Sequence, residues 1–188
     1  MPCADLLGQL CPTETVCQHH LGVGAGPGPV LATECLIFAV FGANARLGAR
    51  LTPNDFPPKS LKSGDLSLAR QSHTSWTTFR DNVLVPRQQR SQPIRGIAVS
   101  RVDALRNLIA EINSSMPATL LRSVCVLDKV ENGEHDGHAA LQFCAEQAGL
   151  RDKEKSVVRA QIQTELARTF SEVRAVSSCY AEAGQEGY

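Results

Sequence analysis

The stretch that decides the fold runs from residue 94 to residue 112 and reads IRGIAVSRVDALRNLIAEI. Residues 94–100 predict a β-strand, because apolar residues alternate there with small or polar ones. Ser100 and Asp103 then have the spacing of a capping box, so a helix is expected to begin there. Residues 122–130 predict a second, buried strand. This order of strand, helix and strand predicts a βαβ-like unit.

The chain beyond this unit predicts a hairpin and a long helix. Residues 131–137 are few enough to connect the buried strand with a partner strand at residues 138–143. An amphipathic helix is predicted over residues 152–176, because apolar residues recur there at helical spacing. The apolar face of this helix consists of Val158, Ile162, Leu166, Phe170 and Val173.

The chain before the unit predicts two more strands, separated by a loop. Residues 34–41 are continuously apolar after the first position, which predicts a strand that is covered on both faces. Residues 42–64 are rich in glycine and proline and predict a loop, which Phe56 is expected to anchor to the core. A short strand is predicted at residues 65–69.

A helix is predicted at residues 74–84, and Pro86 is expected to end it. Residues 86–95 then predict a polar loop. The region from this helix to the end of the loop contains four arginines, namely Arg80, Arg87, Arg90 and Arg95. No aromatic residue between positions 80 and 95 could stack on a base, so a solvated loop is favoured over nucleic acid binding.

Together these elements predict an α+β fold. It is a single domain with a mixed β-sheet, one βαβ-like unit, a C-terminal hairpin and a long amphipathic C-terminal helix. The Gly/Pro-rich run at residues 22–29 predicts that residues 1–29 form a flexible or poorly ordered arm. Residues 30–178 are the predicted globular domain, and residues 179–188 are a predicted C-terminal tail.

Composition narrows the class of protein. Basic and acidic residues balance at 19 each, so the net charge attracts neither nucleic acid nor an anionic membrane. The cysteines are odd in number, at 7, which favours free thiols in a reducing cytoplasm over a disulfide framework. The longest apolar run, residues 35–41, is too short to span a membrane, and we expect no secretory signal.

The first candidate site is the stretch DKVENGEHDGH at residues 128–138. Carboxylates and imidazoles are dense there, as general acid–base pairs and metal sites require. If the hairpin forms, Asp136 and His138 lie on the same side of their strand, and Asp128 on the paired strand can reach that side in a suitable register. The spacing matches no metal-ligand signature, so no metal is predicted. The alternative is a solvated turn around the Asn-Gly pair at residues 132–133.

The second candidate site is the stretch GDLSLARQSH at residues 64–73. A helix N-terminus offers free amide donors and an arginine offers a bidentate fork, so the end of this strand suits an anion. Ser67, Arg70 and His73 are therefore candidate binding or catalytic groups. The alternative is an ion pair between Arg70 and a surface acid, with His73 merely near a helix cap.

The third candidate site is a thiol–imidazole cluster near the N-terminus. Cys11, Cys17, His19 and His20 could together hold a structural zinc ion. Their spacing lacks the two-residue knuckle of zinc fingers, so an arm with incidental cysteines is favoured. The glycines at residues 22–28 do not predict a dinucleotide-binding loop, because no strand precedes them.

Two functions remain open. The first is a small enzyme or ligand-binding domain that acts on a charged substrate, with no cofactor specified. The residues assigned to it are His138, Asp136 and His73 as catalytic groups and Arg70, Ser67 and Asp128 as substrate-binding groups. The second is a non-enzymatic accessory or interaction protein of the kind found in small bacterial operons. The first function requires that the segment near residue 70 and the turn before residue 138 meet across the sheet.

Overall fold

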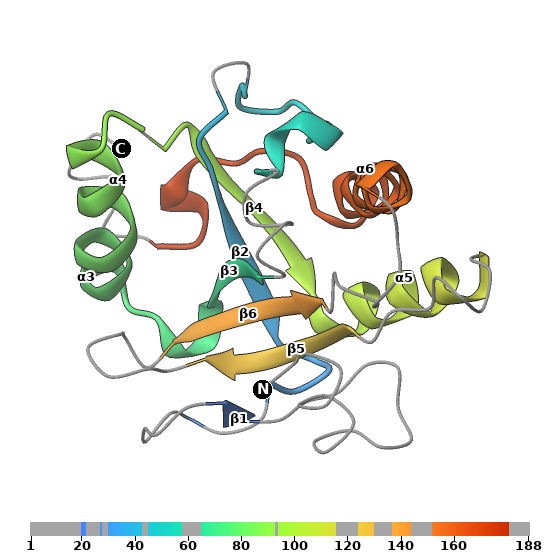
Figure 1. The fold of residues 1–188 in the computed structure, drawn as a ribbon. Helices are drawn as coiled ribbons and strands as arrows, with labels where there is room; N and C mark the ends of the chain where they lie inside the picture. The colour runs from blue at the N-terminus through green and yellow to red at the C-terminus, as the bar shows by residue number, and fades with distance from the viewer. Residues whose placement is uncertain are drawn as a thin grey trace.

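At the centre of the part of the chain that the structure describes lies a six-stranded β-sheet with the order β1-β5-β6-β3-β2-β4 (Figure 1). This computed structural model describes residues 20–21, 27, 30–42, 45–57, 65–92, 94–115, 124–129, 137–143 and 152–180. The strands are β1 (His20–Leu21), β2 (Cys35–Val40), β3 (Asp65–Arg70), β4 (Gly96–Arg101), β5 (Val124–Lys129) and β6 (His138–Phe143). Neighbouring strands in this sheet are antiparallel except β1 and β5, which are parallel. The predicted α+β class with a mixed sheet is therefore confirmed.

The βαβ-like unit consists of β4, α5 (Val102–Ser115) and β5. The antiparallel pairings from β4 through to β5 give these two strands the same direction. They are not neighbours, however, because β2, β3 and β6 lie between them in the described sheet. Helix α5 therefore leads the chain from one edge of the sheet toward the opposite edge, so the unit is wider than the sequence suggested.

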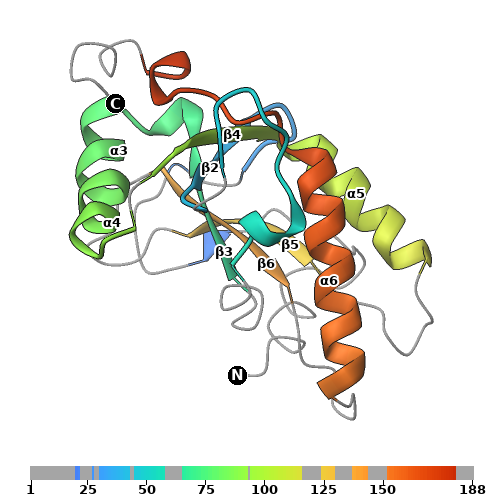
Figure 2. The same ribbon diagram turned by 90° about the horizontal axis from the view of Figure 1, so that it is seen from above.

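Helices cover both faces of the sheet (Figure 2). One face carries α3 (Trp76–Phe79), a π-helical turn (Arg80–Leu84) and α4 (Val85–Gln89), and the other carries α5 and α6 (Asp152–Thr169). Strand β2 is buried between these layers. Its Leu36 and Phe38 belong to the apolar cluster of α5 and α6, whereas Ile37 belongs to the cluster of α3. Both faces of β2 are thus covered, as its continuous apolar run predicts.

The prediction that Pro86 ends its helix is wrong. Helical structure continues from Trp76 to Gln89, with Pro86 inside it. The π-helical turn explains this, because the amide of Val85 donates to the carbonyl of Arg80, five residues back. A widened turn relieves the clash between a proline ring and the preceding turn. Residues 86–89 of the predicted polar loop are consequently helical, and Arg87 is half-buried with its guanidinium 4.3 Å from the centre of the Phe41 ring.

Helix α6 ends at Thr169, seven residues before the predicted end at residue 176. The chain leaves the helix there to run along β4, the edge strand of the described sheet. Arg174 exchanges two backbone hydrogen bonds with Ile97, and Ser171 donates to the carbonyl of Val99. This pairing covers backbone groups that an open sheet edge would leave exposed. Val173 stays buried in the extended segment, so its apolar character did not require a helix.

Several predictions lie wholly or mainly outside the described residues. They concern the N-terminal arm apart from residues 20–21 and 27, the loop at residues 58–64, the turn at residues 131–136 and the C-terminal tail beyond residue 180. Within the part of the chain that the structure describes, no helix is long and apolar enough to cross a membrane.

Candidate functional site

The pairing of β3 with β6 brings two of the predicted site segments together. Ala69 lies opposite His138 in the antiparallel register, and the amide of Arg70 donates to the carbonyl of Gly137 over 2.8 Å. The end of β3 therefore meets Gly137 and the start of β6 across the sheet, while residues 131–136 of the predicted turn lie outside the described residues.

The side chains of these segments nevertheless separate onto two faces. Ser67 and His138 share one face, and the Ser67 Oγ lies 2.8 Å from the His138 Nε2. Arg70 points to the opposite face, because side chains alternate along β3 and its neighbours Leu66 and Leu68 pack toward α5 and α6. The structure thus divides the predicted site between the two faces of the sheet.

The predicted site includes two acids that the structure does not place in it. The backbone of Asp128 pairs with that of Ala139, but the Asp128 side chain lies outside the description. Asp136 lies outside it entirely. For the described site residues, Ser67 meets His138, while Arg70 and His73 meet a residue that the sequence did not single out, Glu34.

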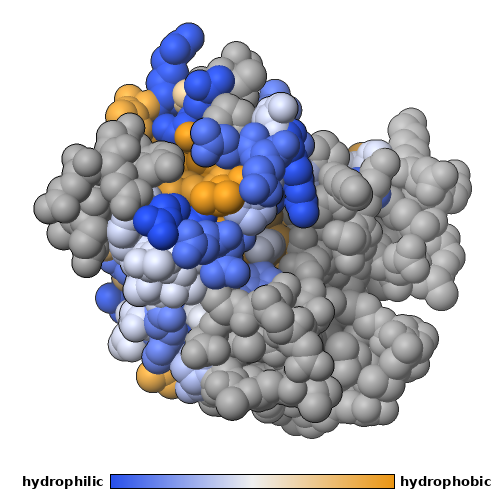
Figure 3. Space-filling view, turned by 90° about the vertical axis from the view of Figure 1, so that its left-hand side faces the viewer, coloured by the Kyte–Doolittle hydropathy of each residue, from blue (hydrophilic) through white to orange (hydrophobic). Residues whose placement is uncertain are grey.

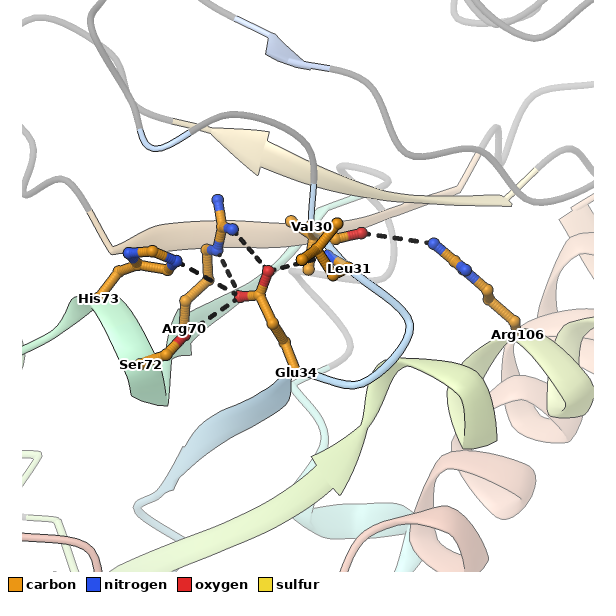
Figure 4. Close-up of polar contacts among 7 residues, drawn as sticks. All are labelled: Val30, Leu31, Glu34, Arg70, Ser72, His73 and Arg106. Carbon is orange, nitrogen blue, oxygen red and sulfur yellow. Dashed lines mark hydrogen bonds and ion pairs between the residues drawn. The ribbon is translucent and has the colours of Figure 1, made fainter.

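Glu34 and Arg70 form a buried ion pair (Figure 4). Arg70 is only 1% exposed, and its Nη2 and Nε donate to the two carboxylate oxygens of Glu34 over 2.6 and 2.8 Å. The amide of Leu31 donates to the same carboxylate over 2.8 Å, and Ser72 Oγ does so over 3.4 Å. His73 Nε2 lies 3.9 Å from it. The guanidinium of Arg70, which the sequence made a candidate clamp for a substrate anion, is thus engaged with Glu34.

The charge of Glu34 is retained in this buried place. Burial by itself would raise the pKa of Glu34, but the hydrogen bonds from Arg70 and the Leu31 amide lower it. Electrostatic interactions with Arg70 and, to a smaller extent, with His73 act in the same direction, and the pKa of Glu34 ends below its ordinary value. Glu34 thus holds the turn before β2 against the end of β3 as a carboxylate.

A cavity of about 690 Å³ adjoins this ion pair. Its walls come from the turn before β2, from the segment between β3 and α3, and from the C-terminal residues after a 3-10 turn (Val176–Ser178). Trp76 and Tyr180 supply aromatic surface, with ring centres 6.2 Å apart. Cys35 and Cys179 are free thiols at the cavity, and burial raises the pKa of Cys179, which keeps it in the unreactive thiol form.

Two hydroxyl groups at this cavity are buried without a hydrogen-bond partner among the described residues. They are the Thr74 Oγ1 and the Tyr180 Oη, in residues that are 4% and 6% exposed. A buried polar group left unpaired costs about 1–3 kcal/mol. Burial, with a smaller contribution from Cys179, raises the pKa of Tyr180, so this hydroxyl stays protonated and available as a donor.

Gly137 packs closely against the segment that carries His73 and Thr74. A Cβ built on Gly137 would overlap the Thr74 Oγ1 and would lie 2.9 Å from the carbonyl oxygen of His73. Only glycine lets the start of β6 approach this segment so closely. The sequence indicates Gly137 as a turn residue, but no pattern near it predicts its close contact with His73 and Thr74.

Gly137→Ala is expected to lower the free energy of unfolding by about 1–3 kcal/mol, because the added methyl group must push two backbones apart. Urea denaturation of the variant and the wild type measures this. Adding Thr74→Ala to the variant should recover part of the loss, since it removes one of the two clashes. A variant as stable as the wild type would show that the close approach is not maintained.

The predicted zinc cluster is not tested by the structure. Cys11, Cys17 and His19 lie outside the described residues, and of His20 only the backbone is described. Within the described part, no group of three or more His, Cys, Asp or Glu side chains could hold a metal ion.

No protein-family model matches this chain, and no curated protein or solved structure matches it either. What the protein does must therefore be inferred from its own geometry.

Proposed function

We propose that the protein is a ligand-binding domain that holds a small, uncharged, partly aromatic molecule in the cavity between α3 and the C-terminal segment. The cavity volume of about 690 Å³ falls in the range of small-molecule sites. The observation that carries the proposal is the pair of unsatisfied hydroxyls, Thr74 Oγ1 and Tyr180 Oη, at a cavity that also has aromatic walls. A ligand whose entry exposes the buried Tyr180 hydroxyl could accept its hydrogen bond, and the ring of the ligand would contact Trp76.

The charge of the cavity favours an uncharged ligand over the charged substrate expected from the sequence. Among the described residues that line the cavity, Glu34 alone carries a formal charge, and Arg70 compensates it. The carboxylate already accepts hydrogen bonds from Arg70, Leu31 and Ser72, so it has little capacity left for a ligand cation. The remaining polar lining consists of hydroxyl and amide groups.

The alternative of an accessory or interaction protein receives less support. Leu31, Leu47 and Val157, the exposed large apolar residues among those described, come from three separate segments. Figure 3 shows the side that carries α3 and α4, where the coloured surface is mainly hydrophilic and its apolar residues gather in one recess and a few small spots. A protein-binding face would present a wider apolar patch. The free thiols Cys35 and Cys179 support our further proposal of a reducing, cytoplasmic location.

Tyr180→Phe is the sharpest test, because it should have opposite effects on stability and on binding. In the free protein, loss of the unpaired hydroxyl should leave the free energy of unfolding unchanged or raise it by up to about 1–2 kcal/mol. Binding should weaken, because the ligand loses a donor. Thermal unfolding with benzamide, nicotinamide, adenosine and uridine as probes measures both effects.

A probe present at a hundredfold excess over its Kd should stabilise the wild type by about 2.7 kcal/mol, which raises its Tm by roughly 5–10 °C. Thr33→Trp at the exposed edge of the cavity should abolish the shift by filling the site. Gln88→Trp, on the exposed side of α4, is the matched control and should leave it intact. Absence of a shift with every probe, or equal shifts in Thr33→Trp and the wild type, would contradict the proposal.

A further inference from the structure

Ser67 and His138 form a second polar pair, and neither residue lines the ligand cavity. They are diagonal neighbours on two paired strands, since Ser67 lies opposite Ala140 and His138 lies opposite Ala69. The Ser67 Oγ is 2.8 Å from the His138 Nε2, within the range of a nucleophile and its general base. Ser67 is exposed and His138 is half-buried, so a reagent can reach the hydroxyl while the sheet holds the imidazole in place.

A cationic group lies at the same place. Ser67 lines a small cavity of about 50 Å³ together with Phe41, Val83 and Arg87. The guanidinium of Arg87 is held over the Phe41 ring, 4.3 Å from its centre. Burial and the neighbouring Arg90 lower the pKa of Arg87 but leave it a cation, because an arginine pKa starts so far above neutrality. Nucleophile, base and cation thus converge between β3 and α4.

We propose that Ser67 is a nucleophile activated by His138 and that it transfers the acyl group of small esters bearing a carboxylate, which Arg87 binds. The Ser67 Oγ attacks the ester carbonyl, and its proton passes to the unprotonated Nε2 of His138. The bond from the carbonyl carbon to the leaving alkoxide breaks, and the alkoxide takes the proton from His138. Water then attacks the acyl-serine, gives its proton to His138 and releases the carboxylic acid, while the proton returns to the Ser67 oxygen.

The test is covalent labelling of the full-length protein with an alkyl fluorophosphonate. The Ser67 oxygen forms a bond to phosphorus, the phosphorus–fluorine bond breaks, and the serine proton leaves through His138. We expect one adduct per chain by intact mass, mapped to Ser67 by peptide sequencing. Ser67→Ala should remain unlabelled, whereas Ser156→Ala, with an exposed serine on α6, should be labelled like the wild type.

His138→Gln separates a general base from a merely structural partner. Glutamine can still form a hydrogen bond to Ser67 but cannot accept its proton, so labelling should slow about a hundredfold or more. Unchanged unfolding temperatures of the variants confirm that they are folded. A wild-type protein that gains no adduct at Ser67, or a His138→Gln variant that is labelled at the wild-type rate, would overturn the proposal.

Substrate choice is tested with p-nitrophenyl acetate and mono(p-nitrophenyl) succinate. The wild type should prefer the succinate ester by at least about tenfold, as a hydrogen bond to a charged group provides. Arg87→Met keeps the apolar stem over Phe41 and should remove this preference by lowering hydrolysis of the succinate ester. A preference that survives Arg87→Met would refute the role of Arg87. Blocking the ligand cavity with Thr33→Trp should not affect either reaction, so the two proposals can fail independently.

Discussion

Arg70→Ala is expected to lower the free energy of unfolding by about 3–5 kcal/mol, because it leaves Glu34 as a buried charge without its main partner. The loss is a large fraction of the total stability of a domain, which is about 5–15 kcal/mol. Arg70 is 1% exposed and spans two segments through hydrogen bonds of 2.6 and 2.8 Å to Glu34, so neither water nor another cation can easily replace it. Urea denaturation at pH 7 measures the effect.

Two controls separate the buried charge from the loss of packing. The double variant Glu34→Leu/Arg70→Met should be more stable than Arg70→Ala, because it removes both charges and keeps the volume. Arg101→Ala breaks an exposed, solvent-screened ion pair with Asp103 and should lower stability far less than Arg70→Ala does. If Arg70→Ala lost no more free energy of unfolding than Arg101→Ala, Glu34 would have to be far more hydrated than the structure shows.

The stability difference between the wild type and Arg70→Ala should depend on pH in a way that identifies Glu34 as its cause. In the wild type the pKa of Glu34 lies below its ordinary value of 4.5, so its contribution to stability is fully present above that pH and is lost as the pH falls through the lower, folded-state pKa. Without Arg70, burial dominates and raises the folded-state pKa above the unfolded one, so protonation stabilises the variant. The difference between the two proteins should therefore be greatest near pH 7 and should shrink in acid.

The elements that sequence analysis located well are those set by local patterns. Strands β2 to β6 begin and end within two residues of their predicted bounds, because alternation and continuous apolar runs depend only on neighbouring residues. The errors arose where distant contacts decide. A π-helical turn carries the chain through Pro86, and pairing with Ile97 draws the residues after Thr169 away from α6. Neither the π-helical turn nor the pairing with Ile97 produces a periodic pattern of residues from which it could be predicted.

The candidate site likewise contains residues that the sequence pointed to and residues that it missed. The enzyme hypothesis required the segments near residues 70 and 138 to meet, but no sequence pattern predicted that β3 pairs with β6 or that Ser67 contacts His138. Glu34 was missed because its partner Arg70 is 36 residues away, and an acid at the start of an apolar strand looks like an ordinary boundary residue. Tyr180 was missed because it lies in the segment that was read as a tail. A cavity assembled from three distant segments has no signature in any one of them.

Phe56→Ala is expected to lower the free energy of unfolding by about 3–5 kcal/mol, the usual cost of truncating a fully buried phenylalanine. The Phe56 ring stacks on the Phe38 ring, with ring centres 5.0 Å apart. Its centre also lies 5.9 Å from that of the Phe170 ring. It therefore joins β2 to the chain just after α6 and, together with the buried Leu51, anchors the loop to the core, which agrees with the role expected for it from the sequence. Urea denaturation measures the loss.

The same variant should also release the loop from the core, because Phe56 fixes it through both its ring and its backbone. The Phe56 carbonyl accepts a hydrogen bond of 2.8 Å from the Gln163 Nε2 on α6, whereas Gly48 and Ala49 are held separately by backbone hydrogen bonds to Val173. Hydrogen exchange should therefore accelerate most at residues 52–57 while the amides of β2 remain protected. Leu47→Ala, a truncation at a 61% exposed position in the same loop, should change neither exchange nor stability by more than about 0.5 kcal/mol. Equal effects of the two substitutions would mean that Phe56 does not anchor the loop.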